Sequence, residues 1–365
     1  MLKLLRSLVT PKPSAEVGAA PALSPPPVAI SAEGSHDFGV TENLVDANGL
    51  PLLDWNAAQQ WVDGITDAAV QARAWSDCER AWLEHLRAAL GPAYRLREQG
   101  NAMLLSTLQN NVAEATLTFV NKTLQRVVRI LDGVANVPEW GHDILVVFDD
   151  DDTYYRYVAH YYPQTGEFAG SGGMYINAGC GHFATVKADL RSIEPVIAHE
   201  LTHACLSHLP IPVWLNEGIA VNTEHRLCPP SFAVSTPQQM HARHRGFWGP
   251  TQIQQFWSGE SFLRSDEGNE LSYDLARIIV FQLSATWDRF RPFVLSATVE
   301  DGGASAASEH LGVHLGEVAS ALLGLEPSPQ WAPNPAAWSG YGPNKTPFAA
   351  LVEAAINRDA LMLFR

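Results

Sequence analysis

The chain has 365 residues, of which 46% are hydrophobic and 17% charged, a composition typical of a globular protein. The formal net charge of -15 at pH 7 argues against nucleic acid as a partner, because a polyanion would be repelled. Four cysteines in a chain of this length, without the spacing of a metal knuckle, do not indicate a disulfide framework.

The N-terminal residues indicate neither a membrane span nor an export signal. No run of about 18 apolar residues occurs anywhere in the chain. Lys3 and Arg6 interrupt the apolar start, which therefore lacks the uninterrupted apolar segment of a secretory signal. We predict a cytoplasmic protein without an integral membrane segment, and the sequence leaves its oligomeric state open. Residues 1–40, rich in proline and alanine, are predicted to be disordered.

The first predicted elements are helical. Within residues 41–92, apolar residues recur at three- and four-residue steps, and a Gly-Pro pair ends the pattern. Alternation over residues 94–105 then predicts strand structure, whereas the spacing over residues 112–131 predicts a helix. The N-terminal region is therefore expected to be helical and to precede a segment of mixed structure.

The next predicted elements complete a small sheet. The apolar run at residues 143–148 indicates a buried strand. Four aspartates at 149–152 follow, and we interpret them as the cap of a helix rather than as a calcium site. The glycine-flanked residues 170–181 predict a short strand or loop without a phosphate-binding motif. From Ser192 onward the pattern is mainly helical, and Ser192 is the expected start of the next helix.

The sequence HELTH carries the clearest chemistry in the chain. His199 and His203 stand four positions apart in a predicted helix, so both imidazoles project from one face. Two neutral imidazoles in this arrangement can bind one zinc ion. Glu200, beside the first histidine, can take a proton from a zinc-bound water.

A third ligand is expected from the next helix. A proline pair ends the HELTH helix, and a second helix, starting near Trp214, carries Glu217 back over the histidines. His208 is the rival ligand, but it lies about 13 Å further along the same helix axis than His199. Glu224 and His225, two turns beyond Glu217, are interpreted as surface residues.

HELTH followed by WLNEGIA resembles the gluzincin metallopeptidases, particularly the peptidase-MA-like group. The resemblance extends over about residues 94–325 and implies that His199, His203 and Glu217 are zinc ligands and that Glu200 is the general base. It also places Tyr273 at the head of a following helix, where its hydroxyl could stabilise an oxyanion. The alternative is that Tyr273 is an aromatic residue packed in the core.

The chain departs from related families at two positions. Thermolysin-type enzymes have an aspartate four residues after the ligand glutamate to orient a zinc histidine, but here that residue is Val221. The orienting group is expected to be Asn216 or a backbone carbonyl. The zinc aminopeptidases hold the substrate amine with the glutamate of a GxMEN sequence, and the nearest match, at residues 172–177, lacks it. An endopeptidase is therefore favoured.

The fold expected from the resemblance is α+β and zincin-like. It comprises a small mixed sheet with an active-site helix, within residues 93–325, and a mainly helical C-terminal half, followed by a loop-rich tail at residues 326–365. The predicted function is peptide-bond hydrolysis on a peptide or protein substrate, whose chain could pair with the strand at Met174–Asn177. The alternatives are a non-catalytic zinc-binding protein and an interaction domain with a degenerate peptidase fold.

Overall fold

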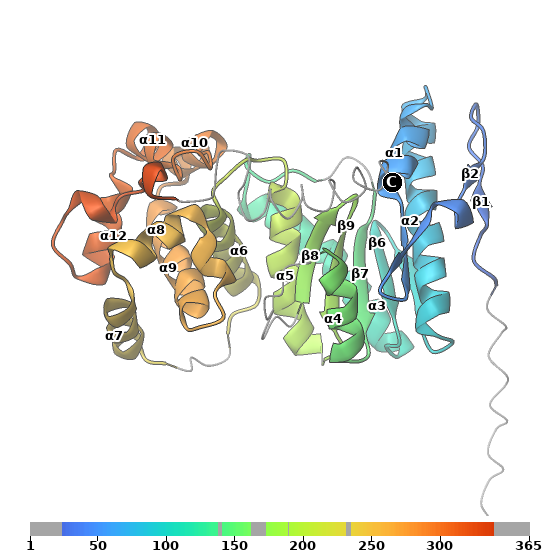
Figure 1. The fold of residues 1–365 in the computed structure, drawn as a ribbon, viewed down its shortest axis with the longest axis horizontal. Coiled ribbons are helices and arrows are strands. Elements are labelled where there is room, and N and C mark those ends of the chain that lie inside the picture. Colours follow the sequence, from blue (N-terminus) through green and yellow to red (C-terminus); the bar gives the residue numbers. More distant parts are fainter. Residues whose placement is uncertain (1–23, 138–140, 162–172, 189, 231–234, 339–365) are drawn as a thin grey trace, which may run out of the picture.

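The computed structural model describes residues 24–137, 141–161, 173–188, 190–230 and 235–338. Figure 1 shows a sheet flanked by helices on one side of the molecule and a mainly helical part on the other, with helix α5 between them. The predicted α+β architecture, with a small mixed sheet and a mainly helical C-terminal half, is confirmed. None of the helices in the described ranges is long and apolar enough to cross a bilayer.

The strands form two short hairpins and one larger sheet. Their bounds are β1 Ala29–Ile30, β2 Phe38–Gly39, β3 Leu44–Ala47, β4 Leu50–Leu53, β5 Arg95–Gln99, β6 Ala102–Ser106, β7 Asp143–Phe148, β8 Gly173–Ala178 and β9 Cys180–Val186. The hairpins β1–β2 and β3–β4 precede the first helix. The first lies within residues 1–40, for which the sequence predicts disorder, and the second lies within residues 41–92, so the region predicted to be helical also contains strands. The predicted buried strand at residues 143–148 is confirmed as β7.

The helices alternate with the strands in the first half of the chain and predominate in the second half. Their bounds are α1 Trp55–Asp63, α2 Ala68–Leu90, α3 Asn110–Ile130, α4 Asp151–Tyr161, α5 Leu190–Leu206, α6 Val213–Leu227, α7 Pro237–Phe247, α8 Pro250–Ser258, α9 Gly268–Leu283, α10 Trp287–Ser296, α11 Ala304–Ala306 and α12 Leu315–Leu323. Local chemistry fixes several of these ends. Asp54 and Asp67 accept hydrogen bonds from the first free N–H groups of α1 and α2. Asp150 accepts from the N–H and hydroxyl of Thr153 at the start of α4, in agreement with the capping interpretation of the aspartate run.

The larger sheet is mixed, with the strand order β5-β6-β7-β9-β8. Strands β6, β7 and β9 are parallel, while β5 and β8 pair antiparallel at the two edges. The residues of the central strands β6 and β7 are all buried, because helices cover both faces of the sheet. Figure 1 places β8 at the edge beside α5, so the edge strand and the HELTH helix are neighbours.

Alternating side chains of the central strands enter two separate cores. Leu104 and Leu145 face a core shared with α3, α5 and the C-terminal helices. Met103 and Ile144, their neighbours in sequence, face a second core shared with α2, α4 and the β3–β4 hairpin. In this way the N-terminal region covers one face of the sheet, and the helix that carries HELTH packs on the opposite face.

Helix α5 starts earlier than the sequence indicates. It begins at Leu190, not at Ser192, so Pro195 lies inside the helix instead of in its first turn. The helix continues to Leu206, and the segment with two prolines that follows leads into α6 at Val213. Gly218 of α6 lies against α9, where an added Cβ would be 2.6 Å from the carbonyl oxygen of Ala276. The absence of a side chain at Gly218 therefore allows α9 to pack closely on α6.

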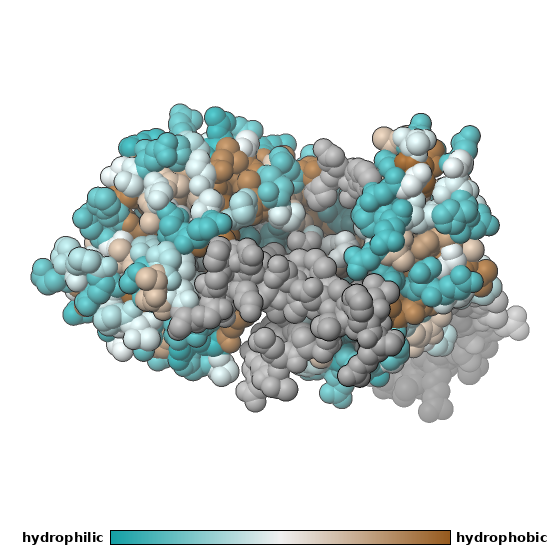
Figure 2. Space-filling view, turned by 45° about the horizontal axis from the view of Figure 1, so that its top comes forward, coloured by the Kyte–Doolittle hydropathy of each residue, from teal (hydrophilic) through white to brown (hydrophobic). Residues whose placement is uncertain are grey.

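The visible surface is mainly hydrophilic. In Figure 2 the coloured atoms are mostly teal or white, with brown apolar spots scattered over both parts of the molecule. Among the described residues, Val28 and Phe281 are the most exposed large apolar side chains, at 69% and 68%. Single exposed apolar residues of this kind are common on soluble proteins and do not define a binding surface.

Candidate metal centre

Three side chains from two helices converge on one point. His199 and His203 project from the same face of α5, and Glu217 reaches them from the second turn of α6. The Nε2 atoms of the two histidines are 3.1 Å apart, and Oε2 of Glu217 lies 3.3 Å from one and 3.4 Å from the other. The sequence prediction that Glu217 would be carried back over the histidine pair is confirmed.

The second nitrogen of each imidazole is held by a residue of α6. Nδ1 of His203 donates to Oδ1 of Asn216 at 2.8 Å, and Nδ1 of His199 donates to a carboxylate oxygen of Glu224 at 3.1 Å. These bonds place the hydrogen of each neutral ring on Nδ1, so each Nε2 presents a lone pair. Both lone pairs then point toward the carboxylate of Glu217.

This arrangement fits a divalent cation. Three acceptor atoms face one another, and Oε2 of Glu217 is buried without a hydrogen-bond partner. Four ligands at about 2.1 Å around a tetrahedral zinc ion lie about 3.4 Å from one another, which matches the observed separations. Three carboxylates, those of Glu200, Glu217 and Glu224, surround the two imidazoles, so the local charge also favours a cation. The two histidines and the glutamate thus form a candidate metal site, and the oxygen and nitrogen donors suit zinc.

Without a metal, protons partly take the place of the cation. Burial opposes protonation of His199, but the adjacent carboxylates of Glu217 and Glu224 outweigh it and raise the pKa of this imidazole. The pKa of His203 is raised as well, because the charge of Glu217 outweighs burial. Burial by itself would raise the pKa of the Glu217 carboxyl, but the two imidazoles lower it. Metal binding at this site therefore releases protons.

Glu200 lies beside the candidate metal site and is held from the sheet. Its half-buried carboxylate accepts a hydrogen bond from the backbone N–H of Tyr175 in β8. Burial raises the pKa of this carboxyl, while the two histidines and the Tyr175 N–H oppose the rise. A carboxylate whose pKa is raised by burial is a stronger base than an exposed one.

Tyr273 lies between the helical core and the candidate metal site. It is half-buried in the second turn of α9, and its ring packs edge-on against Phe262 with the ring centroids 5.2 Å apart. The same ring lies 6.4 Å from that of His199. Tyr273 therefore contributes to the packing of the helical half and also borders the candidate metal site.

The structure corrects the interpretation of Glu224 as a surface residue. Its carboxylate contacts His199, and its side chain is only 25% exposed. The helical period contains the signal for this contact, because residues seven positions apart on a helix share a face, and Glu224 follows Glu217 by seven. Asn216 is confirmed as the orienting group for His203, and the rival ligand His208 is exposed beyond the end of α5.

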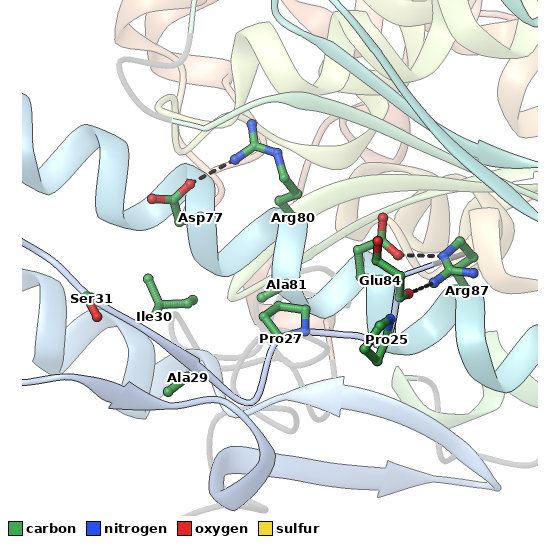
Figure 3. A pocket seen from close by; sticks show the side chains of 11 residues that line it. Pro25, Pro27, Ala29, Ile30, Ser31, Asp77, Arg80, Ala81, Glu84 and Arg87 are labelled. Carbon is green, nitrogen blue, oxygen red and sulfur yellow. Dashed lines mark hydrogen bonds and ion pairs between the residues drawn. The ribbon is translucent and has the colours of Figure 1, made fainter. Parts of the chain in front are cut away.

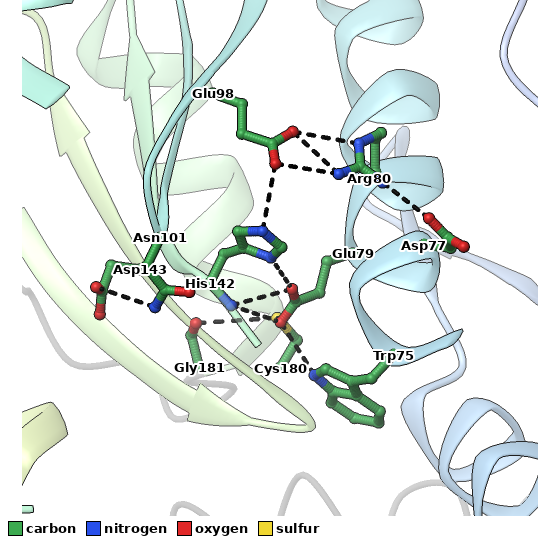
Figure 4. Close-up of polar contacts among 10 residues, drawn as sticks. All are labelled: Trp75, Asp77, Glu79, Arg80, Glu98, Asn101, His142, Asp143, Cys180 and Gly181. Carbon is green, nitrogen blue, oxygen red and sulfur yellow. Dashed lines mark hydrogen bonds and ion pairs between the residues drawn. The ribbon is translucent and has the colours of Figure 1, made fainter. Parts of the chain in front are cut away.

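A second polar cluster lies on the other side of the sheet. The carboxylate of Glu79 in α2 is 2% exposed and accepts hydrogen bonds from Nε1 of Trp75 and from both the backbone N–H and Nδ1 of His142 (Figure 4). Nε2 of His142 lies 3.5 Å from the carboxylate of Glu98 in β5. These contacts connect α2, β5 and the start of β7, so we interpret the cluster as structural.

A cavity of about 630 Å³ lies between α2 and residues 24–31 (Figure 3). Its two arginines already have partners within the chain. Arg80 pairs with Asp77, and Arg87 pairs with Glu84 and donates to the carbonyl of Ser24. A ligand would have to displace these contacts, and the lining includes no residue of the candidate metal site.

Comparison with known proteins adds no assignment. No family model matches the chain, and no curated protein matches it significantly. The assignment of function therefore depends on the residues themselves.

Proposed function

We propose that the protein is a zinc-dependent metallopeptidase of the gluzincin type, similar to the peptidase-MA-like group. The observation that supports this most strongly is the convergence of a ring nitrogen from each of His199 and His203 with a carboxylate oxygen of Glu217, with the other nitrogen of each imidazole already bonded to α6. Three protein ligands are typical of catalytic zinc sites, whereas structural zinc sites usually have four.

Each residue of the site has a role in this proposal. Zinc, when bound, would supply Lewis acidity and a water whose pKa is lowered to about 7. Glu200 accepts a proton from water and returns it to the leaving amine nitrogen. Glu224 and Asn216 hold the two imidazoles in the tautomer that ligates metal. The Tyr273 hydroxyl donates to the oxyanion that forms as the peptide carbonyl is attacked.

An endopeptidase is the favoured form of this activity. β8, the strand beside α5, contains most of residues 172–177, the stretch nearest to the amine-binding GxMEN sequence of zinc aminopeptidases. This stretch has no carboxylate to hold the amino terminus of a substrate. A substrate bound along the edge of the sheet could therefore extend in both directions from the scissile bond.

A non-catalytic zinc protein is the main alternative. In that case the metal would only join α5 to α6, and Glu200 would have no chemical role. The half-buried position of the Glu200 carboxylate beside the ligand histidines favours catalysis, because burial of a charged group without a function is costly.

Metal content tests the first part of the proposal. We expect about one zinc per chain in the purified protein by plasma mass spectrometry, as a single three-ligand site requires. The His199→Ala/His203→Ala double variant should lose it. A wild-type protein that takes up no zinc, even when zinc is supplied, would rule out both zinc-based functions.

Hydrolysis tests the second part. Cleavage of a quenched peptide library by the zinc-loaded protein should fall at least about 100-fold in the Glu200→Gln variant, because glutamine cannot accept the proton. Zinc content should stay unchanged, since Glu200 is not a ligand. A zinc-loaded protein that cleaves no peptide would favour the non-catalytic alternative.

A further inference from the structure

In the edge strand β8, the backbone N–H and C=O groups of alternate residues point away from the neighbouring strand β9. In an antiparallel pair, the N–H and C=O of one residue point to the same side, and the next residue points to the other. Tyr175 stands opposite Phe183 of β9, yet its N–H donates to the carboxylate of Glu200. The backbone N–H and C=O of Tyr175 therefore point away from β9, while those of Met174 and Ile176 point toward β9.

The side chain of Tyr175 fixes the position of this N–H group. Its ring packs on that of Phe183 with the centroids 5.0 Å apart. Its hydroxyl lies over Gly181, where an added Cβ would be 2.2 Å away. The ring also belongs to the core that contains α5. Because the ring is anchored on β9, the N–H of Tyr175 is a rigid donor rather than part of a free strand edge.

We propose that the backbone N–H of Tyr175 positions Glu200 for proton transfer, so that Tyr175 is a positioning residue of the active site. This inference rests on the proposed function. A glutamate side chain has three rotatable bonds, and a charge-assisted hydrogen bond from a rigid donor selects one of its conformations. The bond thereby couples the position of the proton acceptor to the packing of the sheet edge.

The same bond limits how a substrate can pair with β8. The Tyr175 N–H is engaged by Glu200, so an added substrate strand would use the Tyr175 carbonyl on the side away from β9. The alternation also means that the N–H of Ile176 bonds within the β8–β9 ladder. Ile176→Pro would therefore remove a hydrogen bond between β8 and β9 and disrupt the sheet edge.

Amide hydrogen exchange tests the bond without relying on activity. The exchange of the Tyr175 amide is measured at residue resolution in the full chain, for the wild type and for Glu200→Ala. We expect exchange at Tyr175 to accelerate at least about 10-fold in the variant, because its acceptor is gone. The Ile176 amide, which bonds to β9, is the internal control and should not change. No acceleration at Tyr175, or equal acceleration at both amides, would overturn the proposal.

A pair of substitutions at one position tests the consequence for catalysis. Tyr175→Ala removes the ring but keeps the N–H, whereas Tyr175→Pro removes both. We expect kcat of the proline variant to be about 10- to 100-fold below that of the alanine variant, with similar KM and zinc content. Equal kcat values would overturn the positioning role. Wild-type cleavage by Glu200→Gln would instead overturn the proposed function, and the exchange result would still stand by itself.

Discussion

A carboxylate oxygen of Glu224 lies 3.1 Å from Nδ1 of His199, on the side of the imidazole away from Glu217. Besides Asn216, which holds His203, helix α6 therefore contributes a ligand and the partner of a ligand, Glu217 and Glu224, from one face and two turns apart. Such partners fix the tautomer and orientation of a ligating histidine and increase its basicity.

Loss of this partner should weaken metal binding. We expect Glu224→Ala to reduce zinc affinity about 10- to 100-fold, and Glu224→Gln to reduce it less because an amide oxygen can still accept from Nδ1. Affinity is measured by competition with a chromogenic chelator. Glu309→Ala, which removes an exposed glutamate elsewhere, is the matched control. Unchanged affinity in Glu224→Ala would mean that the contact does not support the metal.

The contact between α6 and α9 can be tested at a glycine. An added Cβ at Gly218 would meet both the carbonyl of Ala276 and a methyl group of Val280 at 2.6 Å, so Gly218→Ala must separate the two helices. We expect it to cost about 1–3 kcal/mol of stability by urea unfolding, and to lower activity by moving Tyr273. Gly246→Ala is the control, because the space around that glycine is open. Alanine there should be neutral or stabilising by up to ~1 kcal/mol.

The hydroxyl of Tyr273 can be separated from its ring. Tyr273→Phe keeps the edge-on contact with Phe262 and removes only the hydroxyl. If the hydroxyl stabilises an oxyanion, kcat should fall about 100- to 1000-fold while KM, zinc content and Tm remain close to wild type. A variant with wild-type kcat would assign Tyr273 to packing alone.

The cluster around Glu79 predicts a dependence of stability on pH. The hydrogen bond from Nδ1 to Glu79 raises the pKa of His142 above its usual 6.5, against the effect of burial. A raised pKa in the folded chain means that the stabilisation is fully present below the unfolded value and is lost as the pH rises through the folded value. The difference in unfolding free energy between wild type and His142→Gln should therefore shrink as the pH rises from about 6 into the alkaline range.

Urea unfolding at several pH values measures this difference. The nearby carboxyl of Asp143, whose pKa burial raises to about 6, is present in both proteins, so its own titration largely cancels. A difference that is constant across this range would show that the proton of His142 does not contribute to folding.

The parts of the site that depend on one helix follow from the sequence alone. His199 and His203 had to share a face if their segment was helical, since the helical period fixes the direction of side chains four residues apart. The proline-containing turn after α5 predicts Glu217 as the third ligand, and Val221 in place of an aspartate predicts Asn216 or a backbone carbonyl as the orienting group. These inferences depend on local geometry, which short-range sequence patterns describe well.

The groups that approach the site from other elements are placed by tertiary packing. The N–H of Tyr175 has no sequence signature, because every residue except proline has this group and strand pairing determines where it points. The closeness of Tyr273 depends on Gly218, which permits α9 to pack on α6. The contact of Glu224 with His199 depends on the angle at which α6 packs against α5. Such contacts arise from the docking of whole elements, which hydrophobic periodicity constrains only in part.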